Sequence, residues 1–239
     1  PLIRQVRSRI NPEKIAVITD STSDIPDEMV EKYGIHILPL RILYKDREYL
    51  DKVEIQPEDV YGRLQVEIPT TSLPRPVDVQ NLFERLKSEG YTHTLVLHLS
   101  SGLSGTGQML SNLGAEVKGM VVKVIDSKSI SMGLGIQAIE AARAVQNQLS
   151  FDAVCQRVEI ARQNSTVHFV LSTLEYLKKG GRIGRVAGTL GEILNVKPII
   201  FVNREGIYET AVKVRGRRQS FERLVAIAKD RLQVPSIVG

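Results

Sequence analysis

The sequence predicts an α/β protein whose parallel sheet is flanked by helices on both faces. Short apolar runs alternate along the 239-residue chain with longer segments of helical spacing. The first run, KIAVITD at 14–20, passes directly into the polar turn sequence STSDIP, as a buried parallel strand does. Such alternation of strands and helices is typical of a parallel sheet that helices cover.

Prolines and glycines mark the elements of the N-terminal part. Pro26 is expected to open a helix through Tyr33, because proline fits the first helical turn, and Gly90 closes an amphipathic helix at 77–89. The three prolines of 69–76 predict a loop without regular structure. The other expected strands are 37–44, 94–100 and 121–126, and the other expected helices are 57–66 and 133–148.

The chain is long enough for two modest domains, which we expect at 1–150 and 151–239. The second α/β domain is expected to begin with a helix at 151–164 and a strand at 167–173, followed by the loop KKGGRIG and a short helix through Leu194. Strands at 197–203 and 207–214 predict a hairpin, and 219–232 predicts a helix. Residues 234–239 resemble the start of another strand, so this C-terminal domain is expected to be incomplete.

Composition narrows the class of protein. No apolar run approaches the roughly 18–20 residues of a membrane span, and the first residues lack a signal-peptide pattern. The single cysteine, Cys155, suits a reducing compartment, so a cytoplasmic location is expected.

Nine basic and four acidic residues in 197–239 suggest an acidic partner or a solvated surface. Nucleic acid is not expected, because aromatic residues make up only 5% of the chain and tryptophan is absent.

The strongest local feature is the hydroxyl-rich sequence SSGLSGTG at 100–107, directly after a predicted strand. Ligands of open parallel sheets bind beyond the carboxyl ends of the strands, and the following helix would direct free N–H groups at an anion. The plain alternative is a capped helix start. Because three serines and Thr106 exceed what one cap requires, we favour a small-anion site.

Other chemistries fit the residues less well. A phosphate-binding loop requires a lysine after the glycines, and a nucleophile elbow requires G-x-S-x-G; neither pattern is present at Ser104. The four histidines show no metal-ligand spacing. An enzyme that acts on a small acyl or phosphorylated substrate at this loop remains the alternative function.

Two further hydroxyl-rich loops accompany the first. Thr70, Thr71 and Ser72 lie in the proline-rich loop, and DSKSIS at 126–131 follows another predicted strand. Three such loops can converge on one acidic group. Neutral hydroxyls without an obligatory lysine suit a carboxylate better than a polyphosphate.

The chain resembles the DegV family of bacterial fatty-acid-binding proteins. Six segments carry the resemblance, in order and over nearly the whole chain: ITDSTSDIP (18–26), PTTSLPRP (69–76), LSSGLSGT (99–106), IDSKSISMGLG (125–135), LEYLKKGGRIG (174–184) and LNVKPII (194–200). The sequence departs from the family pattern at Leu73 and Arg75, where glutamine and serine are usual. Family members also continue further, into a histidine-glycine-proline-glycine segment.

The resemblance implies two α/β domains that enclose a long-chain fatty acid in an apolar interdomain tunnel. It also implies that Thr71 and Ser104 bind the carboxylate, with Ser72 and Ser101 as close seconds. Some family members are the lipid-presenting subunit of a fatty-acid kinase, and Arg182 matches a basic position that works with the kinase subunit.

We therefore expect a carrier that is not itself an enzyme. It would hold one fatty acid, require no cofactor or metal, and present the carboxylate to an ATP-dependent kinase subunit for acyl-phosphate formation in phospholipid metabolism. Contact with a membrane is expected to be transient at most.

Overall fold

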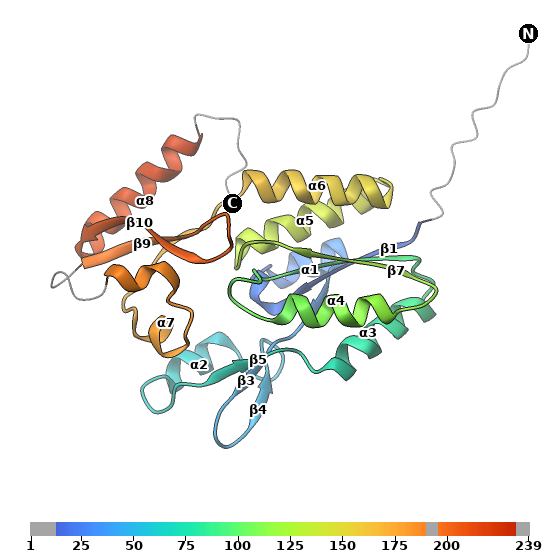
Figure 1. Cartoon of the computed structure of the whole chain (residues 1–239), viewed down its shortest axis with the longest axis horizontal. Helices are drawn as coiled ribbons and strands as arrows, with labels where there is room; N and C mark the ends of the chain where they lie inside the picture. Colours follow the sequence, from blue (N-terminus) through green and yellow to red (C-terminus); the bar gives the residue numbers. More distant parts are fainter. Residues whose placement is uncertain (1–12, 190–195, 233–239) are drawn as a thin grey trace, which may run out of the picture.

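The central element is a four-stranded parallel sheet. The computed structural model describes residues 13–189 and 196–232, and its sheet has the order β2-β1-β6-β7 (Figure 1). All three neighbouring pairs are parallel, as the alternation of strands and helices predicted. The four strands are β1 (Ile15–Asp20), β2 (His36–Leu38), β6 (His93–His98) and β7 (Val121–Asp126).

Helices cover both faces of this sheet. Along β1, Ile15 and Val17 join one apolar cluster, whereas Ala16 and Ile18 join the other, because successive strand residues point to opposite faces. The first cluster packs under α1 (Asp27–Tyr33), α5 (Met132–Gln146) and α6 (Phe151–Asn164); the second packs under α3 (Pro76–Ser88) and α4 (Thr106–Glu116). The result is the three-layered arrangement of Figure 1.

A small antiparallel sheet is inserted between β2 and α3. Its order is β4-β3-β5, with β3 (Arg41–Leu43), β4 (Glu48–Leu50) and β5 (Thr70–Ser72), and α2 (Pro57–Arg63) connects β4 to β5. The prediction of one strand at 37–44 is wrong. Pro39, which has no N–H to donate, separates β2 from β3, and the two strands belong to different sheets.

The prediction that 69–76 lacks regular structure is also wrong in part. Pro69 and Pro74 flank the segment, but the three residues of β5 between them keep their N–H groups and pair with β3. The strand lies at the edge of its sheet, where proline is tolerated nearby. The third proline, Pro76, begins α3.

The C-terminal part contains a second antiparallel sheet of order β10-β9-β8. Its strands are β8 (His168–Val170), β9 (Val196–Val202) and β10 (Tyr208–Arg215), accompanied by α7 (Glu175–Lys179), η2 (Gly184–Thr189) and α8 (Gly216–Leu232). The hairpin of β9 and β10 confirms the predicted one. The expected end of a short helix at Leu194 and the expected strand at 234–239 lie outside the described residues.

The two parts share one continuous apolar core. Phe151, Val154 and Val158 of α6 pack in the same cluster as β1, β6 and α5, and this cluster also includes Ile200 and Tyr208 of the C-terminal hairpin. The boundary predicted between residues 150 and 151 would separate α6 from α5, although these two helices pack against each other. The packing favours a division after α6.

The buried carboxylate of Asp20 joins the ends of β1 and β6. Asp20 is 1% exposed, and its Oδ2 accepts the Leu99 N–H at 2.7 Å while its Oδ1 accepts the Thr22 N–H at 3.0 Å. Burial raises the pKa of Asp20, and the hydrogen bonds from Thr22 and Leu99 oppose that rise. The chain passes from β1 to β2 on one side and later to β6 on the other, so Asp20 lies at the topological switch point, where parallel sheets bind ligands.

Replacing this carboxylate by an amide, Asp20→Asn, is expected to lower the free energy of unfolding by about 1–3 kcal/mol, because the amide nitrogen would face an N–H that it cannot accept. Urea denaturation measures the loss. The control is Glu116→Gln, an exposed side chain at the end of α4, for which a change within about 0.5 kcal/mol is expected. Equal losses in the two variants would contradict the role of Asp20.

Candidate functional site

A cavity of about 1120 Å³ lies between the central sheet, the small sheet and the C-terminal part. Tyr61 of α2 and Ile160 of α6 line it while being 67% and 54% exposed, so the cavity reaches the surface. Its volume lies just above the roughly 300–1,000 Å³ typical of small-molecule sites. Much of its wall is apolar and comes from all three parts: Ile42, Val60, Ile130, Met132, Ile136 and Phe169.

Polar groups gather where the cavity meets the end of β1. Ser21, Thr22 and Ser131 contribute hydroxyls there, and Asp51 and Lys52 contribute charges. Ser131 ends the hydroxyl-rich loop predicted at 126–131. No site role was predicted for the other four residues, although Ser21 and Thr22 directly follow the first strand. Their position beyond a strand end was the signal that would have identified them.

The loop at 100–107 follows β6 and is closed by its own hydrogen bonds. Ser100 Oγ accepts the Gly102 N–H at 3.1 Å, and Ser100 O accepts the N–H groups of Leu103 and Ser104 at 2.9 and 3.2 Å. Ser104 Oγ accepts the Thr106 N–H at 3.3 Å and bonds to Thr106 Oγ1 at 2.9 Å. These backbone donors are occupied, so the loop offers a ligand hydroxyls rather than an N–H cradle.

Ser101 is exposed beside a charged pair at the end of β7. Its N–H donates to Asp126 Oδ1 at 3.3 Å, and the same carboxylate accepts Lys128 Nζ at 2.9 Å. Burial would raise the pKa of Asp126, but the hydrogen bonds from Lys128 and Ser101 outweigh it and lower the pKa. The loops at 100–107 and 126–131 are therefore joined, as the sequence analysis expected.

Thr71 and Ser72 lie on opposite faces of the small sheet. Thr71 pairs with Ile42, and paired residues share a face; Ile42 lines the cavity. Ser72 pairs with Arg41 and its Oγ accepts Arg41 Nη2 at 2.9 Å. The register thus turns Ser72 away from the face that Thr71 shares with Ile42.

Arg182 lies against the loop at 100–107, which we call the serine loop. Its Nε donates to Leu103 O at 3.3 Å and its Nη1 donates to Gly180 O at 2.6 Å, while the residue remains exposed. The structure therefore brings the predicted basic position next to Ser104. Arg182 is also close enough to affect Tyr208, which lines the cavity.

Tyr208 presents a neutral hydroxyl to the cavity. Burial raises its pKa to about 12, a rise that the positive charge of Arg182 opposes. Its ring packs edge-on against Phe169, with 5.4 Å between centroids. Tyr208 and Phe169 therefore make this part of the wall aromatic, and the Tyr208 hydroxyl is uncharged at neutral pH.

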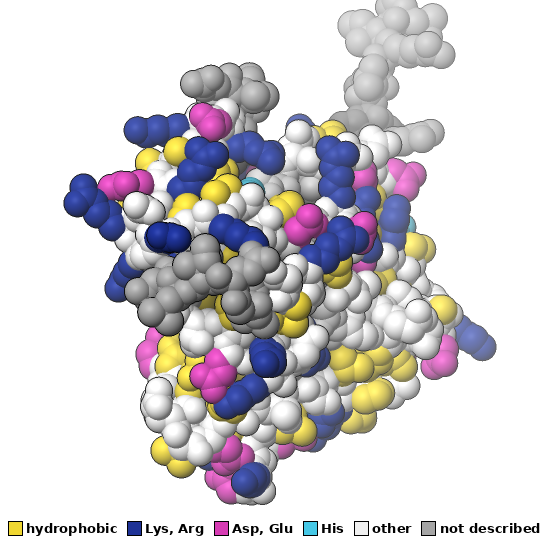
Figure 2. Space-filling view, turned by 60° about the vertical axis from the view of Figure 1, so that its left-hand side comes forward, with side chains coloured by type: hydrophobic (Ala, Val, Ile, Leu, Met, Phe, Trp, Pro, Cys, Tyr) yellow, Lys and Arg dark blue, Asp and Glu magenta, His cyan; other side chains and the backbone are white. Residues whose placement is uncertain are grey.

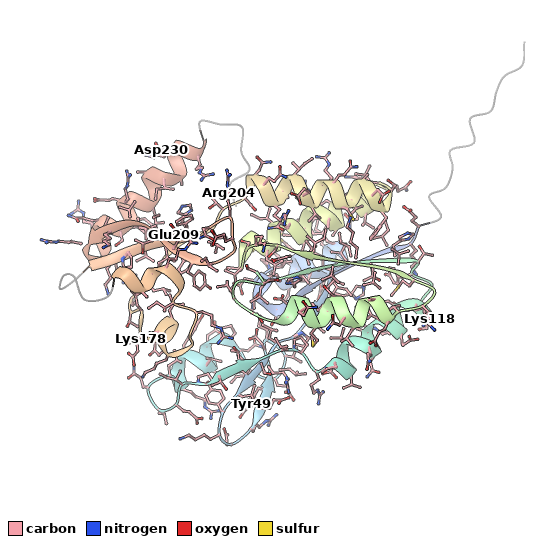
Figure 3. All side chains as sticks on the ribbon, in the orientation of Figure 1. Tyr49, Lys118, Lys178, Arg204, Glu209 and Asp230 are labelled. Carbon is pink, nitrogen blue, oxygen red and sulfur yellow. The ribbon has the colours of Figure 1, made fainter. Side chains whose placement is uncertain are left out.

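The C-terminal hairpin is locked onto the serine loop through two glycines. Ser100 Oγ donates to Gly206 O at 2.7 Å. A Cβ on Gly102 would come within 2.7 Å of Gly206 O, and one on Gly206, whose φ is 82°, within 1.9 Å of Ser100 Oγ. Figure 3 shows the side chains around this hairpin, with Arg204 at its turn and Glu209 on β10.

The predicted carboxylate-binding residues lie beside the cavity and are not part of its lining. The residues that line the cavity do not include Thr71, Ser72, Ser101, Ser104 or Arg182. Much of the cavity wall is apolar, and its polar rim comes from Ser21, Thr22 and Ser131. Thr71 adjoins it through Ile42, and the serine loop adjoins it through the Gly206 turn that precedes Tyr208.

Within residues 13–189 and 196–232, no helix is long and apolar enough to cross a membrane. The His, Cys, Asp and Glu side chains of the same residues form no group of three that could hold a metal ion.

Fold and cavity together define a two-part α/β protein with a large cavity between a parallel sheet and a smaller C-terminal sheet. A family profile described as "Uncharacterised protein, DegV family" matches residues 14–237. A DegV domain-containing protein of Clostridium acetobutylicum is 44% identical over 220 residues, which are 92% of this chain and 79% of that relative. The chain belongs to the DegV family.

Solved structures of similar fold are described as fatty-acid binders. A DegV family protein of Thermus thermophilus, described by its fatty-acid binding, has a TM-score of 0.84 and 33% identity, and the match covers 91% of this chain and 78% of that one. DegV of Bacillus subtilis, described as a fatty acid binding protein, has a TM-score of 0.84, 29% identity and the same coverage. A stearic acid-binding protein of Eubacterium ventriosum has a TM-score of 0.85, 25% identity, and coverage of 92% and 77%.

The glycine lock between the two parts can be tested with a matched pair of variants. Gly206 and Gly119 have φ values of 82° and 81°, but a Cβ on Gly119 meets nothing within 4 Å. Both alanine variants incur the strain of left-handed backbone, about 1–2 kcal/mol; only Gly206→Ala also displaces the hairpin from Ser100. We expect Gly206→Ala to lower the melting temperature several degrees more than Gly119→Ala. Equal melting temperatures in calorimetry would refute the lock.

Proposed function

We propose that this protein carries one long-chain fatty acid, with the tail in the cavity between its two parts and the carboxylate at the hydroxyl groups around the cavity rim. The observation that carries the proposal is the large, mainly apolar-walled cavity whose rim is lined or adjoined by serine and threonine hydroxyls. The membership in the DegV family supports it, since related structures are described as fatty-acid binders.

The apolar wall would supply most of the affinity. Burying about 14 methylenes at roughly 0.8 kcal/mol each gives on the order of 11 kcal/mol before ordering costs. A hydrogen bond to a charged group contributes about 1.5–3 kcal/mol. On these magnitudes the tail determines affinity, and hydroxyls such as Thr71 and Ser104 determine orientation.

The serine loop favours binding over catalysis at Ser104. Its hydroxyl bonds to Thr106, whereas a serine nucleophile requires an adjacent general base. His98, at the end of the preceding strand, donates Nδ1–H to Leu99 O at 2.6 Å and packs against Gly107. The occupied backbone donors of the loop also favour a carboxylate over a polyphosphate.

We also propose that the carboxylate is presented to an ATP-dependent kinase subunit for acyl-phosphate formation. Arg182 supports this, because an exposed guanidinium next to Ser104 suits developing phosphoryl charge. Figure 2 shows Lys and Arg side chains over one face of the molecule, with Asp and Glu side chains among them. Positive charge of this kind speeds the encounter with an acidic partner.

Fatty-acid content is the direct test. Protein purified in native form and extracted with organic solvent should yield about one long-chain fatty acid per chain, measured by mass spectrometry. In Thr71→Ala/Ser104→Ala, retention should fall only modestly while acyl-phosphate formation with the kinase falls severely, because the tail supplies most of the binding free energy. Wild-type protein without fatty acid would refute the carrier function. A double variant that is folded but contains no fatty acid would refute the proposal that the tail determines affinity and the hydroxyls only orientation.

The proposed role of Arg182 in presenting the carboxylate is tested by removing one positive charge at Arg182 and, as a control, one at Lys118. Arg182→Ala should leave fatty-acid content intact and lower kinase-dependent turnover on the order of tenfold at low ionic strength, with less difference at high salt. The control is Lys118→Ala, an exposed lysine at the far end of the molecule from Lys178 and the Arg182 loop (Figure 3). Equal turnover and equal salt dependence of the two variants would leave Arg182 without a role in presentation.

A further inference from the structure

The small sheet and α2 form a separate lobe, residues 41–72, which we call the Thr71 lobe. The structure describes all of these residues, and none of them belongs to either apolar cluster of the protein. Its strands pack with one another, through β3 with β4 and β3 with β5. In Figure 1 the lobe projects from the central sheet. It is therefore attached without a share in the main hydrophobic core.

Polar contacts attach the lobe to the end of β1. Ser21 Oγ donates to Asp51 Oδ2 at 2.6 Å and accepts the Leu40 N–H at 3.1 Å. Lys52 Nζ donates to Ser21 O at 2.7 Å and forms an ion pair with Asp24. We call these contacts of Ser21, Asp24, Asp51 and Lys52 the polar joint. All four residues line the cavity.

Two residues of the polar joint are held in conformations or surroundings that cost free energy. Lys52 adopts a left-handed backbone with φ of 61°, which costs a residue other than glycine free energy unless its surroundings enforce it. Burial raises the pKa of Asp51, and the hydrogen bond from Ser21 opposes that rise. Each hydrogen bond to a charged group in the joint contributes about 1.5–3 kcal/mol, and the joint can open by breaking these few contacts without disrupting a packed apolar cluster.

The joint connects directly to the wall that carries Thr71. Asp51 follows β4, whose Leu50 pairs with Arg41 of β3, and β3 pairs in turn with β5. Thr71 and the cavity-lining Ile42 are partners in that ladder. Because a hydrogen-bonded ladder moves as one body, displacement at Asp51 displaces Thr71, whereas Ser104 stays with the central sheet.

We infer that Asp51 and Lys52 are positioning residues: through the polar joint they hold the Thr71 lobe against the cavity, and opening of the joint moves this wall to admit or release the ligand. The inference rests on the proposed carrier function for the nature of the ligand. The mobility of the lobe itself does not depend on it.

Ligand release provides the first measurement. Protein loaded with radiolabelled palmitate is mixed with excess unlabelled palmitate, and the dissociation rate is compared between wild type, Lys52→Met, Ser21→Ala and Lys52→Arg. We expect release about tenfold faster in Lys52→Met and Ser21→Ala, because each loses joint contacts, and near-wild-type release in Lys52→Arg, which keeps the charge. The control is Lys87→Met, which removes a 2.7 Å ion pair with Glu84 within α3 and should not change release.

Hydrogen exchange of ligand-free protein provides the second measurement. In Lys52→Met, amides of residues 41–72 should exchange about tenfold faster than in wild type, whereas those of β1 and β6 should keep their rates. Unchanged release in a palmitate-binding protein overturns the inference, as does faster exchange spread equally over β1 and β6. If wild-type protein binds no palmitate, the proposed carrier function is wrong. The exchange experiment still tests the joint, because faster exchange in Lys52→Met confined to residues 41–72 shows that the joint holds the Thr71 lobe.

Discussion

The arrangement of the whole site depends on one buried carboxylate. Asp20 ends β1 at the point where the chain connections diverge, and it accepts hydrogen bonds from Thr22 on one side and Leu99 on the other. A carboxylate 1% exposed is tolerated because its oxygens are occupied by donors. The serine loop begins directly after Leu99, and the polar joint begins at Ser21. Both functional regions therefore start from the same fixed point.

The parts of the molecule around Asp20 differ in how they are attached to one another. The central sheet and its helices share packed apolar clusters, and the C-terminal hairpin enters the larger one through Ile200 and Tyr208. The glycine contact at Gly206 locks the hairpin to the serine loop. The Thr71 lobe, by contrast, is held by polar contacts. The proposed carrier function requires that the ligand be both retained and released, and this division of packing allows one wall to move while the others stay.

Hydrogen bonds to the backbone limit which groups of the serine loop are left to bind an anion. Ser104 and Ser100 each bond to the backbone of their own loop, which shapes the loop and consumes donors that an anion would otherwise bind. Ser72 is similarly held by Arg41. Thr71, Ser101 and Arg182 are exposed residues next to the cavity or the serine loop.

The sequence by itself determined the parallel sheet, most helices and the C-terminal hairpin, because hydrophobic periodicity, prolines and glycines act locally. Its motifs also indicated the family and the hydroxyl-rich loops. Only the tertiary structure separated β2 from β3, paired β5 into a sheet, and turned Thr71 and Ser72 to opposite faces. It also brought Ser21 to Asp51 and Arg182 to Leu103, contacts between residues 30 and 79 positions apart. Such contacts depend on strand register and on packing between distant segments, which no local pattern encodes.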